Sequence, residues 1–227
     1  MAAHFTVELF GFLAELEENN TREWFNENKD RYLTYVQEPA LGFITDFGPR
    51  LSLISPHFRA DARVQGGSLF RIYRDTRFTA DKTPYKTNTG VHFRHERAKD
   101  AHAPGFYLHI EPGESFVGVG LWRPETKVAY QIREVIADDT DGWAEAVHGT
   151  PFRDRFQLAG DSLQRPPKGF DPDHPHIDDL RRKDFIGMVR LEDQDVISDD
   201  FIDRFDGLCQ DGSGLMRFLC GAVGVPF

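Results

Sequence analysis

Apolar residues recur every three or four positions through the first quarter of the chain, the spacing that gathers them on one face of a helix. The first predicted helix carries on that face Leu9, Phe10, Leu13 and Leu16. Thr6 precedes it as the expected N-cap, because a threonine side chain can accept a hydrogen bond from a free amide of the first turn. A second helix is predicted from Thr21 to an interruption at Pro39, and a third from there to about Ile54. These helices are expected to cover a sheet.

In the middle of the chain, apolar residues recur at every second position, which is typical of strands with two different faces. Strands are predicted over residues 69–74, 90–94, 106–111, 116–122 and, later, 185–191. The sequence Glu-Pro-Gly-Glu at 111–114 predicts a turn between the third and fourth of these strands. Further helices are predicted after Pro124, after a capping Ser198 and over about residues 215–220, and residues 160–175 are expected to form a long loop.

The alternation sorts the middle strands into two faces. One face is a continuous apolar row that needs covering, made of Val91, Phe93, Phe106, Leu108, Ile110, Val117, Val119 and Leu121. The other face carries Tyr107, His109, Glu111, Phe116, Gly118, Gly120 and Trp122. Glycine inside a strand often marks a close approach by another group, either a ligand or packed protein. Because helix-on-sheet packing is the commonest fate of a sheet face, we expect a helix or backbone segment over the two glycines.

Helices at both ends around a mainly antiparallel sheet predict an α+β fold. The 227 residues suit one domain over residues 1–227. Its parts are expected to be a helical region at 5–55, a sheet core at 63–123 and a helix, loop and C-terminal region at 124–227. Hydrophobic residues make up 40% of the chain and charged residues 28%, which are ordinary values for a packed protein.

Net charge narrows the choice of partners. The 27 basic and 37 acidic residues give −10 at pH 7, and duplex nucleic acid and anionic membranes repel so acidic a chain. No window approaches the ~20 apolar residues of a membrane-spanning helix. The N-terminus shows no signal peptide, so a cytoplasmic location is expected. The cysteines, Cys209 and Cys220, are expected to be buried free thiols.

Residues 59–99 differ from this balance, because they hold ten basic and four acidic residues while the other 186 residues carry a charge of −16. A concentrated local charge of +6 in an acidic protein attracts an anion to one place. Arginine suits this role because its planar fork binds phosphate or carboxylate oxygens with two parallel hydrogen bonds. The ligand-binding residues predicted on this basis are Arg71, Arg74, Arg77, Asp81, Lys82, Tyr85, Lys86 and Tyr107. The equally supported alternative is an internal network in which Asp75 and Asp81 neutralise the cations.

The basic segment also carries a family resemblance. Residues 71–86 contain Arg-x-x-Arg-Asp-x-Arg-Phe followed by Asp-Lys-x-x-Tyr-Lys, which resembles the signature of a widespread bacterial family, domain of unknown function 2461. The segments at 19–25, 105–112, 118–124 and 180–185 resemble further motifs of that family. The resemblance covers nearly the whole chain and implies a single full-length domain of a bacterial type. It implies no activity.

An enzyme hypothesis rests on one strand face. His109 and Glu111 share that face with Tyr107, histidine titrates near neutrality, and a carboxylate can orient its ring. The candidate catalytic residues are therefore His109, Glu111 and, from the basic segment, Asp75, with His92 or Arg94 on a neighbouring strand. The alternative is an ordinary solvated strand face. The hypothesis requires His109 to lie on the same side of the sheet as Arg74.

Residues 171–179 contain aspartate and histidine, which zinc or manganese accept, but they also fit an exposed turn before a helix. No metal ligand is assigned from them, and no cofactor is identified. The function expected first is binding of a phosphorylated or carboxylated small molecule. One alternative is an acid–base enzyme acting on a phosphorylated or nucleotide substrate. The other is a non-catalytic interaction module, whose residues 171–211, with 13 acidic and five basic residues, would contact a basic protein partner.

Overall fold

The computed structural model describes residues 3–97 and 104–227. The N-terminal quarter is helical and consists of α1 (Val7–Glu18), α2 (Arg22–Glu27), α3 (Lys29–Tyr32), the π-helix η1 (Leu33–Gln37) and α4 (Glu38–Ile54). The strands are β1 (Thr89–Arg94), β2 (Gly105–Ile110), β3 (Phe116–Leu121), β4 (Gln157–Ala159) and β5 (Phe185–Arg190). The later helices are α5 (Thr126–Asp138), α6 (Thr140–His148), α7 (Phe152–Arg155), α8 (Ile177–Leu180), α9 (Asp193–Val196), α10 (Phe201–Asp211) and α11 (Ser213–Ala222).

The strands form one sheet in the order β1-β2-β3-β5-β4, and every neighbouring pair is antiparallel. With helices on both the N-terminal and C-terminal sides, the fold is α+β as predicted. The predicted strands at 90–94, 106–111, 116–122 and 185–191 are confirmed to within one residue at each end. The predicted turn between β2 and β3 is closed by a 3.0 Å hydrogen bond from the Glu114 amide to the Glu111 carbonyl.

The prediction of a helix break at Pro39 is wrong. Helices α3, η1 and α4 follow one another without a gap, and Pro39 lies in the first turn of α4, directly after the π-helix. The interruption falls instead at Asn28, between α2 and α3. Thr21 caps α2 by accepting a hydrogen bond from the Trp24 amide, whereas the Thr6 side chain caps nothing although it stands at the predicted N-cap.

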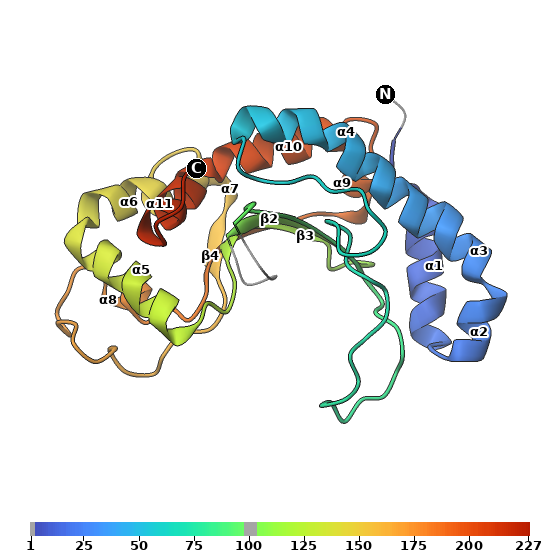
Figure 1. Cartoon of the computed structure of the whole chain (residues 1–227), viewed down its shortest axis with the longest axis horizontal. Helices are drawn as coiled ribbons and strands as arrows, with labels where there is room; N and C mark the ends of the chain where they lie inside the picture. The colour runs from blue at the N-terminus through green and yellow to red at the C-terminus, as the bar shows by residue number, and fades with distance from the viewer. Residues whose placement is uncertain (1–2, 98–103) are drawn as a thin grey trace.

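The strand predicted at 69–74 is also wrong. That segment makes only isolated bridges, Leu69 to Val91 and Tyr73 to Tyr85. The chain folds back on itself instead, with hydrogen bonds from the Arg74 amide to the Pro84 carbonyl and from the Lys86 amide to the Ile72 carbonyl. Residues 71–86 therefore form an irregular two-stranded projection, called the basic arm below, which extends away from the sheet in Figure 1.

In the C-terminal half the predicted cap of α10 is wrong and α6 was not expected as a separate helix. The N-cap of α10 is Asp200, while the Ser198 hydroxyl donates to the Asp195 carbonyl. Asp139 caps α6 by accepting from the Gly142 amide at 3.0 Å, so the polar run that ends α5 also begins α6. The short elements α7, β4 and α9 also went unpredicted, because segments of three or four residues are too short to show a period.

One face of the sheet is closed. The apolar row predicted for it is buried throughout, with each side chain at most 2% exposed. Helices α4 and α10 lie over this face in Figure 1, and α11 also contacts β3. Phe47 of α4 lies 4.9 Å from Phe93 of β1 and 4.8 Å from Phe205 of α10, ring centre to ring centre. The helices at the two ends of the chain thus share one aromatic core above the sheet.

The opposite face, called the open face below, carries the alternate residues of the same strands. Cross-strand pairing aligns His92, Tyr107, Gly118 and Met188 in one row, and Arg94, Gly105, Gly120 and Ile186 in the next. Over the part of the chain that the structure describes, no helix lies across this face, and the basic arm descends beside it (Figure 1).

A single buried carboxylate joins two loops at one end of the sheet. Asp184, only 3% exposed, accepts from the Arg123 amide at 2.8 Å and from the Asp161 amide at 2.9 Å. It thereby holds the turn between β3 and α5 against the start of the 160–175 loop. Among residues 3–97 and 104–227, none of the helices combines the length and apolar character that crossing a bilayer requires.

Candidate functional site

A cavity of about 350 Å³ lies on the open face, a size within the range of small-molecule sites. Its lining is mainly aromatic and aliphatic and comes from β1, β2, β3, β5 and the residue before the basic arm. The lining residues are Phe70, His92, Gly105, Tyr107, His109, Phe116, Gly118, Val119, Gly120, Trp122, Ile186 and Met188.

The glycines of this face differ in how much space surrounds them for a side chain. A Cβ on Gly105 would lie 2.2 Å from Nε2 of His92, and one on Gly120, where φ is +126°, would lie 2.1 Å from the Phe185 carbonyl oxygen. A Cβ on Gly118 would meet nothing closer than 3.8 Å. The expected cover over the two glycines is therefore wrong, because both line the cavity and the close approach at Gly120 comes from β5, the strand paired beside β3 in the sheet.

Four polar side chains form a hydrogen-bonded chain along one wall. Tyr107 Oη lies 3.2 Å from Nδ1 of His109, whose Nε2 lies 2.9 Å from Oε2 of Glu111. The Thr87 hydroxyl donates to the other oxygen of Glu111 at 3.0 Å. Since a carboxylate only accepts, Nε2 of His109 carries the hydrogen in that bond, which leaves Nδ1 of the neutral ring to accept from Tyr107.

The surroundings fix the protonation state of Tyr107. Burial, with a smaller contribution from the Glu111 charge, raises the pKa of Tyr107 to about 12. The phenol therefore stays protonated near neutral pH and keeps donating to His109. His109 is held flat against Phe116, with ring centres 4.6 Å apart and planes 14° apart. The chain of polar groups is thus oriented by packing as well as by hydrogen bonds.

His92 is a buried polar side chain without a hydrogen-bond partner among the described residues. It is 7% exposed, lines the cavity and makes ring contacts with Phe70 and Tyr107 only. Burial, and to a smaller extent the Arg94 charge, lowers the pKa of His92 to about 4. Near neutral pH its ring is therefore uncharged and offers one donor and one acceptor that the protein leaves unused.

Positive charge lies at the edge of the cavity. The Lys86 ammonium is 5.3 Å from the ring centre of Phe70, and that ring contacts Tyr107 at 5.8 Å. Burial and the nearby Arg71 lower the pKa of Lys86. Within the described ranges, neither Lys86 nor Arg71 has a carboxylate oxygen within 4.0 Å. Lys86 therefore stands at the cavity edge without a neutralising ion pair among the described residues, while the charge of Arg71 acts on both Lys86 and Asp75.

The outer part of the basic arm behaves differently, because its cations are paired within the arm. Arg77 binds Asp75 through both carboxylate oxygens, at 2.9 and 2.7 Å. Arg74 binds Asp81 and Thr83. The hydrogen bond from Arg77 lowers the pKa of Asp75 to about 2. Mutual neutralisation is thus present here as the alternative interpretation expected, but in solvent: the Arg77 side chain is 76% exposed.

The residues predicted from the sequence therefore fall into two groups. Tyr107 and His109 line the open-face cavity, Glu111 binds His109, and Lys86 at the end of the arm lies against Phe70 at the cavity edge. The others lie in the arm, where the structure places Arg71, Arg74, Arg77, Asp75, Asp81, Lys82 and Tyr85.

A second concavity, of about 650 Å³, lies between the arm and α2 and includes Arg74 and Lys82. The Lys82 ammonium donates to the Thr76 carbonyl at 2.7 Å. Tyr85, one of the predicted ligand-binding residues, is buried and stacks on Phe25 with ring centres 4.1 Å apart. Asn20 binds both the amide and the carbonyl of Tyr85, so it anchors the arm to the N-terminal helices.

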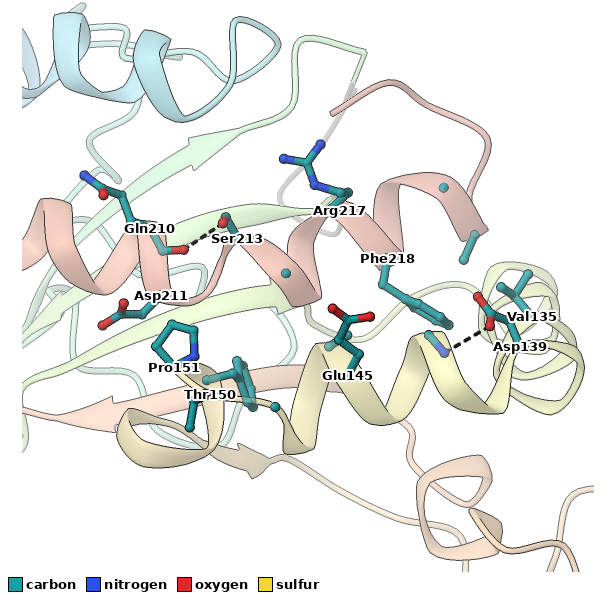
Figure 2. A pocket seen from close by; sticks show the side chains of 17 residues that line it. Val135, Asp139, Glu145, Thr150, Pro151, Gln210, Asp211, Ser213, Arg217 and Phe218 are labelled. Atoms are coloured by element: carbon teal, nitrogen blue, oxygen red, sulfur yellow. Dashed lines mark hydrogen bonds between the residues drawn. The ribbon is translucent and has the colours of Figure 1, made fainter.

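A third concavity, of about 580 Å³, runs between α6 and α11 (Figure 2). Gly214 lines it without side-chain bulk, and a Cβ there would make only an ordinary contact, at 3.9 Å, with the Ala146 backbone. Figure 2 shows the Glu145 carboxylate between the helices and the Arg217 guanidinium pointing away from it. Its polar groups do not converge on one point, and we assign it no chemistry.

Sequence reasoning missed Phe70, Ile186 and Met188 as cavity residues. Alternation along β5 places Ile186 and Met188 on one face, but nothing in the sequence says that β5 pairs with β3. Phe70 was assigned to a strand that does not form. His92 was named only as a neighbour of His109, and its burial depends on Phe70 and Tyr107, which are distant in sequence.

The sequence model of one family, described as conserved hypothetical protein (DUF2461), matches residues 8–218. The chain belongs to this family, as its motifs indicated. No curated protein matches the chain. The family description names no activity, so a functional conclusion has to come from the geometry of the site.

Proposed function

We propose that the open-face cavity binds a small organic anion with a flat apolar body and a phosphate or carboxylate group. The observation that carries the proposal is His92, a neutral and almost completely buried imidazole whose nitrogens have no protein partner at the cavity wall. Buried polar groups are normally hydrogen-bonded, and an exception at a cavity is a reason to look for a ligand.

The shape of the cavity supports a flat apolar body. Gly118 contributes backbone alone to the floor, while Phe116, Trp122 and Phe70 supply rings around it. Aromatic rings favour stacked or edge-to-face contacts with other planar groups. Ligand sites of this type are mainly apolar, with a few placed polar groups that fix orientation. His92 and Tyr107 are the polar groups here.

The charges at the edge support an anionic group. Lys86 and Arg71 repel one another, and an anion between them would relieve that repulsion. Arg71 adds a planar fork of donors that suits phosphate or carboxylate oxygens. With −10 overall, the protein attracts an anion only where such cations concentrate, which limits binding to this edge and the arm.

An acid–base enzyme is the second candidate, favoured by the hydrogen-bonded chain of Tyr107, His109 and Glu111. A substrate hydroxyl could pass its proton to Tyr107 Oη while the phenol passes its own proton to Nδ1 of His109. Glu111 would then stabilise the resulting imidazolium. This relay uses two of the three predicted catalytic residues and gives no role to Asp75, which binds Arg77.

Binding is tested by following thermal unfolding with phenyl phosphate, benzoate, nucleoside monophosphates and, as anions without an apolar ring, sugar phosphates. A ligand present at 100 times its Kd stabilises the folded state by about 2.7 kcal/mol. We expect Lys86→Gln to weaken binding by about 10- to 100-fold, because a hydrogen bond to a charged group is lost. Gly118→Val should abolish it by filling the floor.

Arg77→Gln is the matched control, since Arg77 comes from the same arm but is exposed and bound to Asp75. Its affinity should equal that of the wild type. Loss of binding in Arg77→Gln with none in Lys86→Gln would place the anion in the outer arm and refute the cavity site. For the enzyme, Tyr107→Phe should lower turnover by about 10²- to 10⁴-fold, a much larger effect than its weakening of ligand binding. Unchanged turnover in that variant would exclude the relay.

A further inference from the structure

A group of three potential metal ligands lies outside the open-face cavity, at α6 and α8 in the C-terminal half of the chain. His148 is the last residue of α6, His176 is the N-cap of α8 and Asp179 lies within α8. One ligand atom from each lies within 4.8 Å of the others. The sequence suggested metal chemistry for residues 171–179 without convergence, and the fold supplies the missing member from a helix 28 positions before His176.

We propose that His148, His176 and Asp179 bind a divalent transition-metal ion, with Zn²⁺ as the representative. Two imidazoles and one carboxylate are a ligand set that zinc accepts, and three protein ligands leave one position for water or another small ligand. Calcium and magnesium are disfavoured because both prefer sites made of oxygen.

The distances need only a small adjustment. Nδ1 of His176 lies 3.7 Å from Oδ2 of Asp179. Zinc bonds of about 2.0–2.2 Å at tetrahedral angles put neighbouring ligand atoms roughly 3.4 Å apart. The His148 side chain is exposed and, among the described residues, makes only a ring contact with His176, with centres 6.2 Å apart and planes 20° apart. Turning that ring toward the metal breaks no hydrogen bond.

Asp179 is already held in position by two donors. Its Oδ2 accepts from Nε1 of the buried Trp143 at 2.8 Å, and its Oδ1 accepts from Nε of Arg182 at 3.0 Å. Carboxylates that bind metals are commonly oriented by such neighbouring hydrogen bonds. The residue is 8% exposed, so the carboxylate stays fixed at the base of the site while the two histidines approach from the solvent side.

The ion would link the end of α6 directly to the start of α8, which are otherwise connected only through the intervening residues 149–175. Residues 149–175, which include β4 and the 160–175 loop, run between His148 and His176. Cross-linking the ends of such a segment lowers the conformational entropy of the unfolded chain. Metal binding should therefore stabilise the folded protein as well as occupy the site.

The experiment uses the full-length protein after removal of metals with a chelator, titrated with ZnCl₂ by calorimetry and with CoCl₂ by visible absorption. We expect saturable binding of one Zn²⁺ per chain, a rise in Tm, and Co²⁺ bands typical of four- or five-coordinate geometry. His148→Ala and His176→Ala should each weaken zinc binding by about tenfold or more. Since His148 is exposed, its substitution leaves the fold intact.

Asp178→Asn is the matched control for local charge. Asp178 neighbours Asp179 in α8, but its side chain is 88% exposed and lies outside the group. Zinc affinity should be unchanged in this variant, which would separate a defined site from general attraction to acidic residues. Absence of saturable binding, equal affinity in His148→Ala and wild type, or equal weakening in Asp178→Asn would each overturn the proposal.

Discussion

The closed and open faces of the sheet are built from alternate residues of the same strands, yet helices cover one face and a cavity lies on the other. On the closed face, Phe106 and Val119 are excluded from solvent by helices from both ends of the chain. On the open face, their neighbours Tyr107 and Gly118 border a cavity. One set of strands thus carries a packed core on one side and a cavity on the other, because successive side chains point to opposite faces of the sheet.

The largest effect should come from matched truncations on the two faces. Phe106→Ala removes a fully buried ring and should cost about 3–5 kcal/mol of unfolding free energy. Phe116→Ala on the neighbouring strand removes a partly exposed ring and should cost about 1–2 kcal/mol. Urea unfolding of both variants measures the difference. Equal losses would mean that the open face is as tightly packed as the closed one.

The next effect is a dependence of the free energy of unfolding on pH, caused by the titration of His92 on the open face. The pKa of His92 is about 4 in the folded protein, below the ~6.5 of an unfolded histidine, so the unfolded state binds the proton first as pH falls. The stability from neutral His92 is complete above about pH 6.5 and declines toward pH 4 by about 3 kcal/mol. His92→Gln, which cannot titrate, should lack this decline, and identical pH profiles would refute the assignment.

A smaller effect should separate two glycines of the open face. Gly105→Ala places a methyl group against the His92 ring and should cost about 1–3 kcal/mol. Gly118→Ala meets only ordinary contacts and should change stability by at most ~0.5 kcal/mol, while reducing the cavity volume. Thermal unfolding of both variants, with the His92 imidazole resonances as a local probe, provides the comparison. A large loss in Gly118→Ala would reveal packing over the floor.

The smallest effect concerns the basic arm, away from both faces. Asp75 and Arg77 form an ion pair in solvent, and such exposed pairs contribute little because water and salt screen them. Asp75→Asn should leave Tm unchanged within error. A clear fall in Tm would show that the arm's internal pairs stabilise the fold, as a scaffold would.

Alternation along β1, β2 and β3 was enough to assign Val91, Tyr107 and His109 to their faces, because side-chain direction in a strand is a local property. The α+β class followed from the change in apolar spacing between the helical ends and the central strands, which is also a local property. What covers a face depends on contacts distant in sequence, and here the expectation was wrong at Gly118. The strand at 69–74 failed because only its start pairs with β1, through the bridge of Leu69 to Val91, and the rest folds back so that Tyr73 pairs with Tyr85.

The candidate site was predictable in part. The residue types of Tyr107, His109 and Glu111 indicated acid–base chemistry, and the structure brings them into hydrogen-bond contact. The basic segment was visible as charge, but sequence could not tell which of its cations were neutralised. That distinction depends on side-chain pairing within the arm, where Arg77 binds Asp75 while Lys86 lies unpaired against Phe70 at the cavity edge.

The shared carboxylate of Asp184 has a consequence for motion. The amides of Arg123 and Asp161 donate to the two oxygens of one buried side chain, so detaching either loop leaves a buried carboxylate oxygen without its donor. We therefore expect the turn after Trp122, at the cavity wall, and the 160–175 loop to open as one cooperative unit. In hydrogen exchange these two amides would report a single opening event, and a ligand that immobilises Trp122 would slow the exchange of both.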